Sequence, residues 1–177
     1  MENYMPMGTT DEHNDFVTAL LLDLANLIKR REVSVKHENC PLVYYGERKF
    51  STGFRLIDVT TIKDTERFLD NITELENVNP DFMLFKDNPY LKNKKRTRTA
   101  GQPDLIVEIW SESNDDNHRA FLKNLYSTSP ITEHWYIEQE SNRVECYIGS
   151  TQLPDQCLTN MLVTQKGLEF DLRYLAV

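Results

Sequence analysis

The sequence predicts an α/β fold, a mixed central β-sheet flanked by helices, and three features support this class. Residues 105–110 form a near-continuous apolar run, which is typical of a strand buried on both faces. Stretches with helical periodicity lie on either side of that run, and shorter β-prone runs are spread along the chain. At 177 residues the chain is long enough for a real core. We expect one domain over residues 9–177, preceded by a flexible tail of residues 1–8.

The first helix is expected to begin at Thr9. Thr9 and Glu12 have the spacing of a capping box, and apolar residues then recur at helical spacing to about Arg31. His13 falls in the first turn of this helix. We interpret it as a solvated histidine, although from that position it could also approach a functional site.

Strand signals and one further short helix follow. Residues 33–45 and 50–61 are β-prone and are separated by a polar turn. Residues 64–76 carry the apolar stripe of a short amphipathic helix, which we interpret as core packing. Pro80 then opens a strand over residues 82–85, where its missing N–H does no harm.

The C-terminal half is predicted to contain a long connection, a helix and four strands. Residues 86–102 are polar and are expected to form the connection. Residues 113–127 predict a helix that begins in a run of cap-forming and acidic residues. The strand-like runs cover residues 134–137, 144–148, 161–163 and 168–172.

Glu108 interrupts the apolar strand of residues 105–110 and is the first candidate functional residue. Burying a carboxylate alone is very costly, so Glu108 must be paired, hydrogen-bonded or bound to a metal ion. Asp104 would lie on the same strand face, but roughly 13 Å away along the strand, too far to share one metal ion. Asp81 is the better partner, because it lies at the start of a different strand that can pair beside this one.

Two carboxylates on neighbouring strands, together with a backbone carbonyl, would make an open site of oxygen ligands. Such a ligand set suits Mg²⁺ or Mn²⁺. A lysine from the following helix could complete the site, and Lys123 is available there. The sequence therefore predicts a divalent metal site at Asp81 and Glu108 with Lys123 beside it.

Five segments and one histidine follow one another along nearly the whole chain in an order that can be compared with known families. His13 lies before a long apolar helix, and the segments are NPDFMLF at 79–85, GQPDLIVEIWSES at 101–113, KNLY at 123–126, ITEHWYIE at 131–138 and KGLEFDL at 166–172. Together they resemble the motifs of the Uma family of putative restriction endonucleases, within the PD-(D/E)XK, restriction-endonuclease-like superfamily.

The resemblance implies a restriction-endonuclease-like core and a metal-dependent DNA endonuclease that hydrolyses phosphodiester bonds. Asp81 and Glu108 would be the catalytic metal ligands for Mg²⁺ or Mn²⁺, and Lys123 would be the catalytic lysine. Two residues depart from the family pattern. Trp110 stands where the superfamily has its lysine, two residues after the Glu, and Arg119 stands where an Asp usually precedes the helix lysine.

A cluster of cations interrupts an otherwise acidic sequence, whose net charge is −8. That net charge argues against a protein that coats nucleic acid indiscriminately. Closely spaced lysines and arginines nevertheless displace counterions from a nucleic-acid backbone, so this segment is a candidate DNA contact. A solvated loop is the alternative interpretation. The cluster comprises Lys92, Lys94, Lys95, Arg96 and Arg98.

Three hypotheses about function stay open. The first is an active DNA endonuclease, expected to be a homodimer because cutting both strands of a duplex usually needs two sites. The second is a catalytically inactive protein of the same fold that binds nucleic acid or a protein partner, which Trp110 and Arg119 favour. The third is that Glu108 is only the buried partner of Lys123 in a structural ion pair.

Composition restricts the setting in which the protein works. The sequence has no apolar run long enough for a membrane span, and its first residues lack the features of a signal peptide, so we expect a cytoplasmic protein. Cys40, Cys146 and Cys157 are widely spaced and suggest neither a disulfide framework nor a zinc site. We interpret all three as small buried apolar residues.

Overall fold

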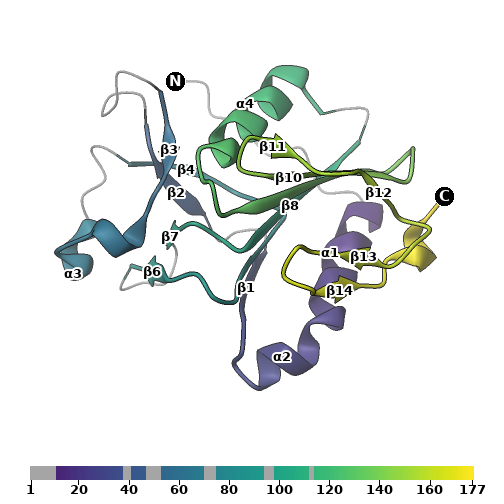
Figure 1. Cartoon of the computed structure of the whole chain (residues 1–177), viewed down its shortest axis with the longest axis horizontal. Helices are drawn as coiled ribbons and strands as arrows, with labels where there is room; N and C mark the ends of the chain where they lie inside the picture. Colours follow the sequence, from purple (N-terminus) through teal and green to yellow (C-terminus); the bar gives the residue numbers. More distant parts are fainter. Residues whose placement is uncertain (1–10, 38–40, 47–52, 70–74, 94–97, 112–113) are drawn as a thin grey trace.

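A computed structural model of the chain describes residues 11–37, 41–46, 53–69, 75–93, 98–111 and 114–177 (Figure 1). Within these ranges a seven-stranded mixed sheet forms the centre of the molecule. β8 and β9 run parallel, whereas β8 pairs antiparallel with β5, and β9 pairs antiparallel with β10. The strands run in the order β1 (Ser34–His37), β5 (Phe82–Phe85), β8 (Leu105–Trp110), β9 (Glu133–Glu138), β10 (Arg143–Ile148) and β11 (Thr151–Gln152), with β12 (Gln156–Cys157) also paired to β10.

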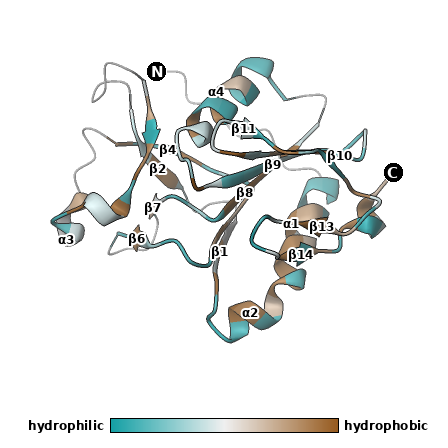
Figure 2. Cartoon of the chain, in the orientation of Figure 1, coloured by the Kyte–Doolittle hydropathy of each residue, from teal (hydrophilic) through white to brown (hydrophobic). Residues whose placement is uncertain are grey.

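The central sheet is covered by a helix on each face, as Figure 1 shows with α1 (Asp11–Asp23) and α4 (Asp116–Ser127) on opposite sides of β8. Leu105, Val107 and Ile109 pack with residues of α1, whereas Ile106 and Trp110 pack with residues of α4. Every side chain of β8 is buried, as predicted for a strand covered on both faces. Hydrophobic colouring is accordingly concentrated in the strands around β8 (Figure 2).

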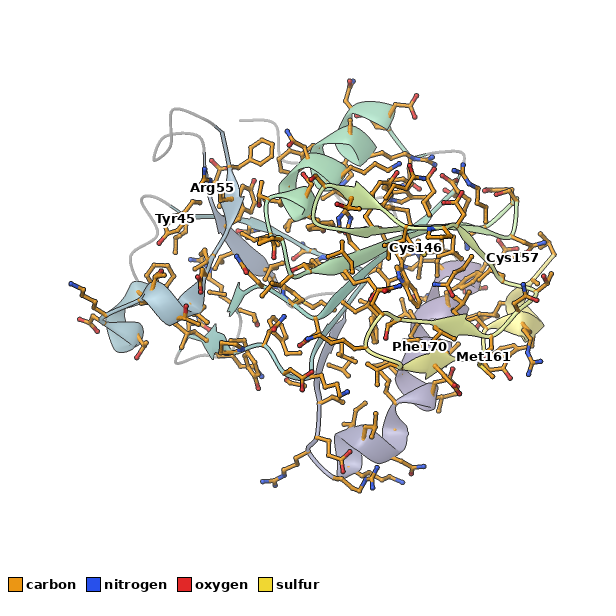
Figure 3. The ribbon with its side chains drawn as sticks, viewed as in Figure 1. Tyr45, Arg55, Cys146, Cys157, Met161 and Phe170 are labelled. Carbon is orange, nitrogen blue, oxygen red and sulfur yellow. The ribbon has the colours of Figure 1, made fainter. Side chains whose placement is uncertain are left out.

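A second mixed sheet packs beside the first. Its strands lie in the order β3-β2-β7-β6, and β4 also pairs with β2. Near the C-terminus, β13 and β14 form a hairpin whose Phe170 makes edge-on contacts with Phe82 and Trp135 (Figure 3). The bounds are β2 (Leu42–Tyr45), β3 (Arg55–Leu56), β4 (Leu75–Val78), β6 (Tyr90–Lys92), β7 (Thr99–Gly101), β13 (Leu162–Val163) and β14 (Glu169–Phe170), with 3₁₀ turns at Val59–Thr61 and Arg173–Leu175.

The predicted helices are present with changed bounds. The first continues as α2 (Ala25–Lys29) after a break at Leu24, and its expected N-cap, Thr9, lies outside the described residues. α4 begins as predicted in the run of cap-forming residues, because the Asp115 side chain accepts a hydrogen bond from the Asn117 backbone N–H. Of the helix expected over residues 64–76, α3 (Thr65–Phe68) is present, residues 70–74 lie outside the described residues, and the prediction is wrong at its end, because Leu75–Val78 is strand β4.

Tertiary pairing explains where local patterns misled the prediction. β4 pairs with β2, and Tyr44 donates a hydrogen bond to Glu76 at 2.8 Å, which fixes that segment as strand. Residues 50–52 of the strand expected over residues 50–61 lie outside the described residues. In the remainder, β3 ends at Leu56 and the chain turns at Asp58, which accepts a hydrogen bond from the Thr60 N–H. The connection over residues 86–102 contains β6 and β7, which pair with one another.

Two cysteines can be compared with the prediction, and Cys40 lies outside the described residues. Figure 3 shows Cys146 within the central sheet and Cys157 towards the periphery, and both are free thiols. Cys146 is buried as expected, whereas Cys157 is only half-buried. Among the described helices, none has the length and apolar character to cross a membrane.

Asp104, which precedes β8, anchors the turn that leaves β5. Its Oδ2 accepts hydrogen bonds from the backbone N–H groups of Lys86, Asp87 and Asn88 at 2.7, 3.0 and 3.0 Å. Its Oδ1 accepts one from the Lys166 ammonium. Burial acts to raise the pKa of Asp104, but Lys166 and the backbone donors outweigh that effect and hold the pKa below its usual value. Asp104 therefore has a structural role.

Asp104→Asn should lower the free energy of unfolding by about 2 kcal/mol at pH 7, because charge-assisted hydrogen bonds to the backbone are weakened. The folded-state pKa is lowered, so this contribution is fully present above the unfolded pKa of about 4 and is lost as the pH falls through the folded pKa. Urea unfolding at pH 7 and pH 3 measures both effects. Asp171→Asn, at an exposed ion pair with Arg173, is the control and should change stability little. An Asp104 deficit that persists unchanged at pH 3 would contradict this account.

Candidate active site

Asp81 and Glu108 meet where β5 and β8 pair at the centre of the sheet. Phe82 lies opposite Val107 in the antiparallel register, so continuing the pairing by one residue places Asp81 opposite Glu108. Glu108 lies between Ile106 and Trp110 on the strand and therefore faces α4. The prediction that these two carboxylates come from adjacent strands is confirmed by this register.

Glu108 is a buried carboxylate with a high proton affinity. Burial raises its pKa well above the usual value, and the negative charge of Asp81 raises it further. The Tyr126 hydroxyl donates a hydrogen bond of 2.5 Å to Glu108 Oε1, which acts in the opposite direction. The carboxylate is thus placed where only a nearby positive charge would fully stabilise its ionised form.

Asp81 is held by the main chain and by the first helix. Its Oδ2 accepts a hydrogen bond of 2.7 Å from the backbone N–H of Ile109, which follows Glu108 on β8. Its Oδ1 lies 3.3 Å from Nε2 of His13, whose side chain is 13% exposed. The interpretation of His13 as a solvated residue is therefore wrong. The histidine packs from α1 against the predicted metal ligand.

Lys123 lies on α4 near the same face of the sheet, but its ion pair is with a residue that the sequence did not single out. The ammonium lies 2.5 Å from Oε2 of Glu145 on β10. It also lies 5.3 Å from the ring centre of Trp110 and 5.1 Å from that of Tyr136. Among the described residues no Lys123–Glu108 ion pair is present, so the hypothesis of a structural pair between them is not supported.

Arg119 also contacts the Trp110 ring. Its guanidinium carbon lies 4.8 Å from the ring centre, and one of its NH groups pairs with Glu138 at 3.2 Å. A second NH group donates to the backbone carbonyl of Ser111. The charge of Arg119 is thus paired with that of Glu138.

The predicted site residues fall into two groups. Asp81 and Glu108 lie together, and Lys123 lies about one strand away, above Tyr136. In the cationic segment, Lys92 is exposed with its ammonium 5.7 Å from the Tyr90 ring centre, and the Arg98 N–H donates to the Asn93 side chain. Lys94, Lys95 and Arg96 lie outside the described residues.

Sequence reasoning missed three residues that complete the site. Tyr126 was visible only as the tyrosine three residues after Lys123 in the KNLY segment. Tyr136 lies within the predicted strand of residues 134–137, and Glu145 lies within the predicted strand of residues 144–148, whose sequence is VECYI. The signal for Glu145 was the same as for Glu108, a carboxylate within an apolar strand.

The donor set of the central pair fits a hard divalent cation. Two carboxylates supply oxygen ligands, and the mutual repulsion that raises the Glu108 pKa is the kind that a bound cation relieves. Within the described ranges no set of three or more His, Cys, Asp and Glu side chains converges as a metal site. A cation here would therefore rely on Asp81, Glu108, main-chain oxygen and water, as Mg²⁺ commonly does.

The arrangement of sheet and helices is similar to that of a nuclease-fold protein of known structure. That protein is described as a putative nuclease belonging to DUF820 from Anabaena variabilis ATCC 29413. It aligns with a TM-score of 0.55 and 13% sequence identity, over 100% of this chain and 87% of that chain. At this identity the likeness establishes a common fold, so the chain has a nuclease-like α/β fold.

The chain belongs to the Uma2 family, described as "Putative restriction endonuclease", whose family model matches residues 3–174. The match includes the whole site, from His13 to Glu145. No curated protein matches the sequence. The resemblance found from the sequence motifs is thus confirmed.

Glu108→Gln should raise the stability of the metal-free protein, because it removes the desolvation cost of a buried carboxylate and its repulsion by the half-buried Asp81. The folded-state pKa of Glu108 is raised, so its stability penalty is absent below the unfolded pKa of about 4.5 and develops as the pH rises through the folded pKa. We expect a gain of about 1–2 kcal/mol at pH 8 and almost none at pH 5, measured by urea unfolding in EDTA.

Glu133→Gln is the matched control for that measurement. Glu133 is also a buried strand glutamate, but its two oxygens accept hydrogen bonds from Trp135 Nε1 and the Gln165 backbone N–H. Its amide variant should lose stability, because the new NH₂ group faces a donor. A Glu108→Gln protein that is less stable than the wild type at pH 8 would show that Glu108 is satisfied without a cation.

Proposed function

We propose that this protein is a metal-dependent DNA endonuclease that hydrolyses phosphodiester bonds. Asp81 and Glu108 would hold Mg²⁺ or Mn²⁺, and Lys123 would act as the catalytic cation. The observation that carries the proposal is the pairing of the buried Glu108 on β8 with the half-buried Asp81 before β5, with a raised Glu108 pKa and a lysine on the covering helix. Membership of the Uma2 family supports the same reaction class.

Each residue has a separate task in this proposal. When bound, the divalent ion polarises the scissile phosphate and lowers the pKa of a water molecule. The Ile109 N–H and His13 orient the Asp81 carboxylate. The Tyr126 hydroxyl orients the Glu108 carboxylate. Lys123 contributes a positive charge towards the phosphate, where negative charge develops during hydrolysis. Water adds across the P–O bond, so no further reactant is needed.

DNA is the proposed partner, and the cationic segment of residues 92–98 is its proposed backbone contact. The segment holds five cations in a chain of net charge −8, and the exposed Lys92 beside Tyr90 lies within it. Such a segment would bind phosphates without reading sequence. We also propose a homodimer, because two sites related by a two-fold axis can cut both strands.

A second candidate function is supported by the position of Lys123. Its ammonium is bound to Glu145, and Trp110 occupies the position that carries the lysine in the superfamily pattern. These features fit a catalytically inactive protein of the same fold that binds nucleic acid or a protein partner. Cleavage assays separate this alternative from the proposed nuclease.

Calorimetric titration of Mg²⁺ and Mn²⁺, with plasmid nicking on the same samples, tests the proposal. The wild type should bind the metal ion and nick DNA, whereas Asp81→Asn and Glu108→Gln should lose both properties, because each removes an oxygen ligand. Lys123→Met should retain metal binding and lose about 10²-fold or more in nicking rate, because it removes only a positive charge.

Glu133→Gln controls for the loss of a buried glutamate elsewhere in the sheet, and it should leave metal binding unchanged. Metal binding by the wild type without nicking would favour the inactive DNA- or protein-binding alternative. A wild type that binds neither metal ion would exclude the metal-dependent mechanism.

Replacing the five cations of residues 92–98 by glutamine should flatten the salt dependence of DNA binding. Each phosphate contact that is lost should change the slope of log K against log salt by about 0.9. If most or all of the five cations contact phosphates, the slope should therefore change by roughly 3–5. Fluorescence anisotropy with a DNA duplex would measure the slope at salt concentrations from about 50 to about 200 mM, where the affinity is expected to change most. An unchanged slope would remove this segment from the interface.

A further inference from the structure

A row of polar and aromatic side chains crosses the central sheet next to the proposed metal site. Glu108 on β8 is in register with Tyr136 on β9, which is in register with Glu145 on β10. Neighbouring strands lie about 4.8 Å apart, so Glu145 is roughly 10 Å from Glu108 across the sheet. Tyr136 occupies the position between these two carboxylates, and Lys123 lies above it.

Three aromatic rings surround the Lys123 ammonium. Its Nζ lies 5.3 Å from the ring centre of Trp110, 5.1 Å from that of Tyr136 and 5.7 Å from that of Tyr147. All three distances fall within the range of cation–π attraction. The ion pair with Glu145 Oε2 at 2.5 Å fixes the direction of the ammonium among these rings. We call Trp110, Tyr136 and Tyr147 the aromatic seat.

The aromatic seat is itself held rigidly. Burial lowers the pKa of His134 to about 4, so the imidazole is neutral at pH 7. Its Nε2 lies 2.9 Å from the Gly149 carbonyl, which can only accept, so Nε2 carries the proton. Its Nδ1 therefore accepts from the Tyr136 hydroxyl at 2.7 Å. The ring of His134 also stacks on Tyr147, with centroids 5.3 Å apart.

Glu145 is fixed independently of Lys123. Arg143 pairs with its Oε1 at 3.0 Å, and the Tyr147 hydroxyl donates to its Oε2 at 3.2 Å. The Glu145 side chain is 12% exposed, whereas that of Lys123 is 34% exposed. The carboxylate is thus the fixed member of the pair, and part of the Lys123 side chain remains open to solvent.

We propose that Glu145 is a positioning residue for the nuclease reaction, acting through Lys123. This inference rests on the proposed function. A lysine has four rotatable bonds, and an unrestrained ammonium would spend most of its time away from the phosphate. Glu145 takes one of the three N–H donors and holds the ammonium on the aromatic seat. The remaining donors are then available to a phosphate bound at Asp81 and Glu108.

Single-turnover plasmid nicking in Mg²⁺ and in Mn²⁺, compared between Glu145→Gln and Glu138→Gln, tests this role. Both variants remove the carboxylate partner of a cation on α4, namely Lys123 and Arg119. We expect Glu145→Gln to nick about tenfold more slowly, as a misplaced catalytic group would. Glu138→Gln should stay within about twofold of the wild type, because Arg119 is not assigned to the reaction. Duplex affinity, measured by anisotropy in EDTA, should be unchanged in both.

The outcomes separate this role from a structural one and from failure of the proposed function. Equal losses in the two variants would assign the effect to helix anchoring and overturn the proposal. A normal rate for Glu145→Gln, or a loss matched by weaker duplex binding, would also overturn it. Where Glu145→Gln does not fold, Glu145→Asp keeps the charge but shortens the reach and should show the same selective slowing. A wild type that does not nick overturns the nuclease function itself, whereas an unaffected variant overturns only the role of Glu145.

Discussion

Two carboxylates in a strand pair at the centre of the molecule set the main constraint on this structure. Glu108 lies on β8, whose side chains are all buried, and Asp81 immediately precedes β5, the strand beside it. Ionised carboxylates in such surroundings are unfavourable, so the neighbouring groups must compensate. The Ile109 N–H, the Tyr126 hydroxyl and His13 supply that compensation in part. Burial and the charge of Asp81 nevertheless hold the pKa of Glu108 well above its usual value.

The site is assembled by the pairing of strands and not by closeness in the sequence. Glu108, Tyr136 and Glu145 stand on three adjacent strands at one level of the sheet, and α4 places Lys123 above them. His13 reaches Asp81 from the opposite side, since α1 covers the other face. The same register therefore fixes the carboxylate pair and the surroundings of the lysine.

The sequence was most informative where a residue broke a strong pattern. Glu108 stood out because its strand was otherwise apolar, and Asp81 followed from the need for a partner. The prediction was weakest where tertiary contacts override local preference, as in β4, where pairing with β2 replaces an amphipathic helix. The partners of His13 and Glu145 could not be assigned from the sequence, because these partners, Asp81 before β5 and Lys123 on α4, are distant in the chain. Such contacts leave no local spacing signal.

The contacts of Trp110 in the fold support a different interpretation of this residue from the one that the sequence pattern suggests. In the sequence it marks the loss of a lysine two residues after Glu108. In the fold its ring lies within cation–π distance of both Arg119 and Lys123, which are one turn apart on α4. An apolar ring at this position can support a charge delivered from a helix, whereas a second lysine would repel it. The substitution of tryptophan for lysine on β8 is therefore consistent with transfer of the positive charge to α4. A decayed site would be expected to lose that aromatic support together with the lysine.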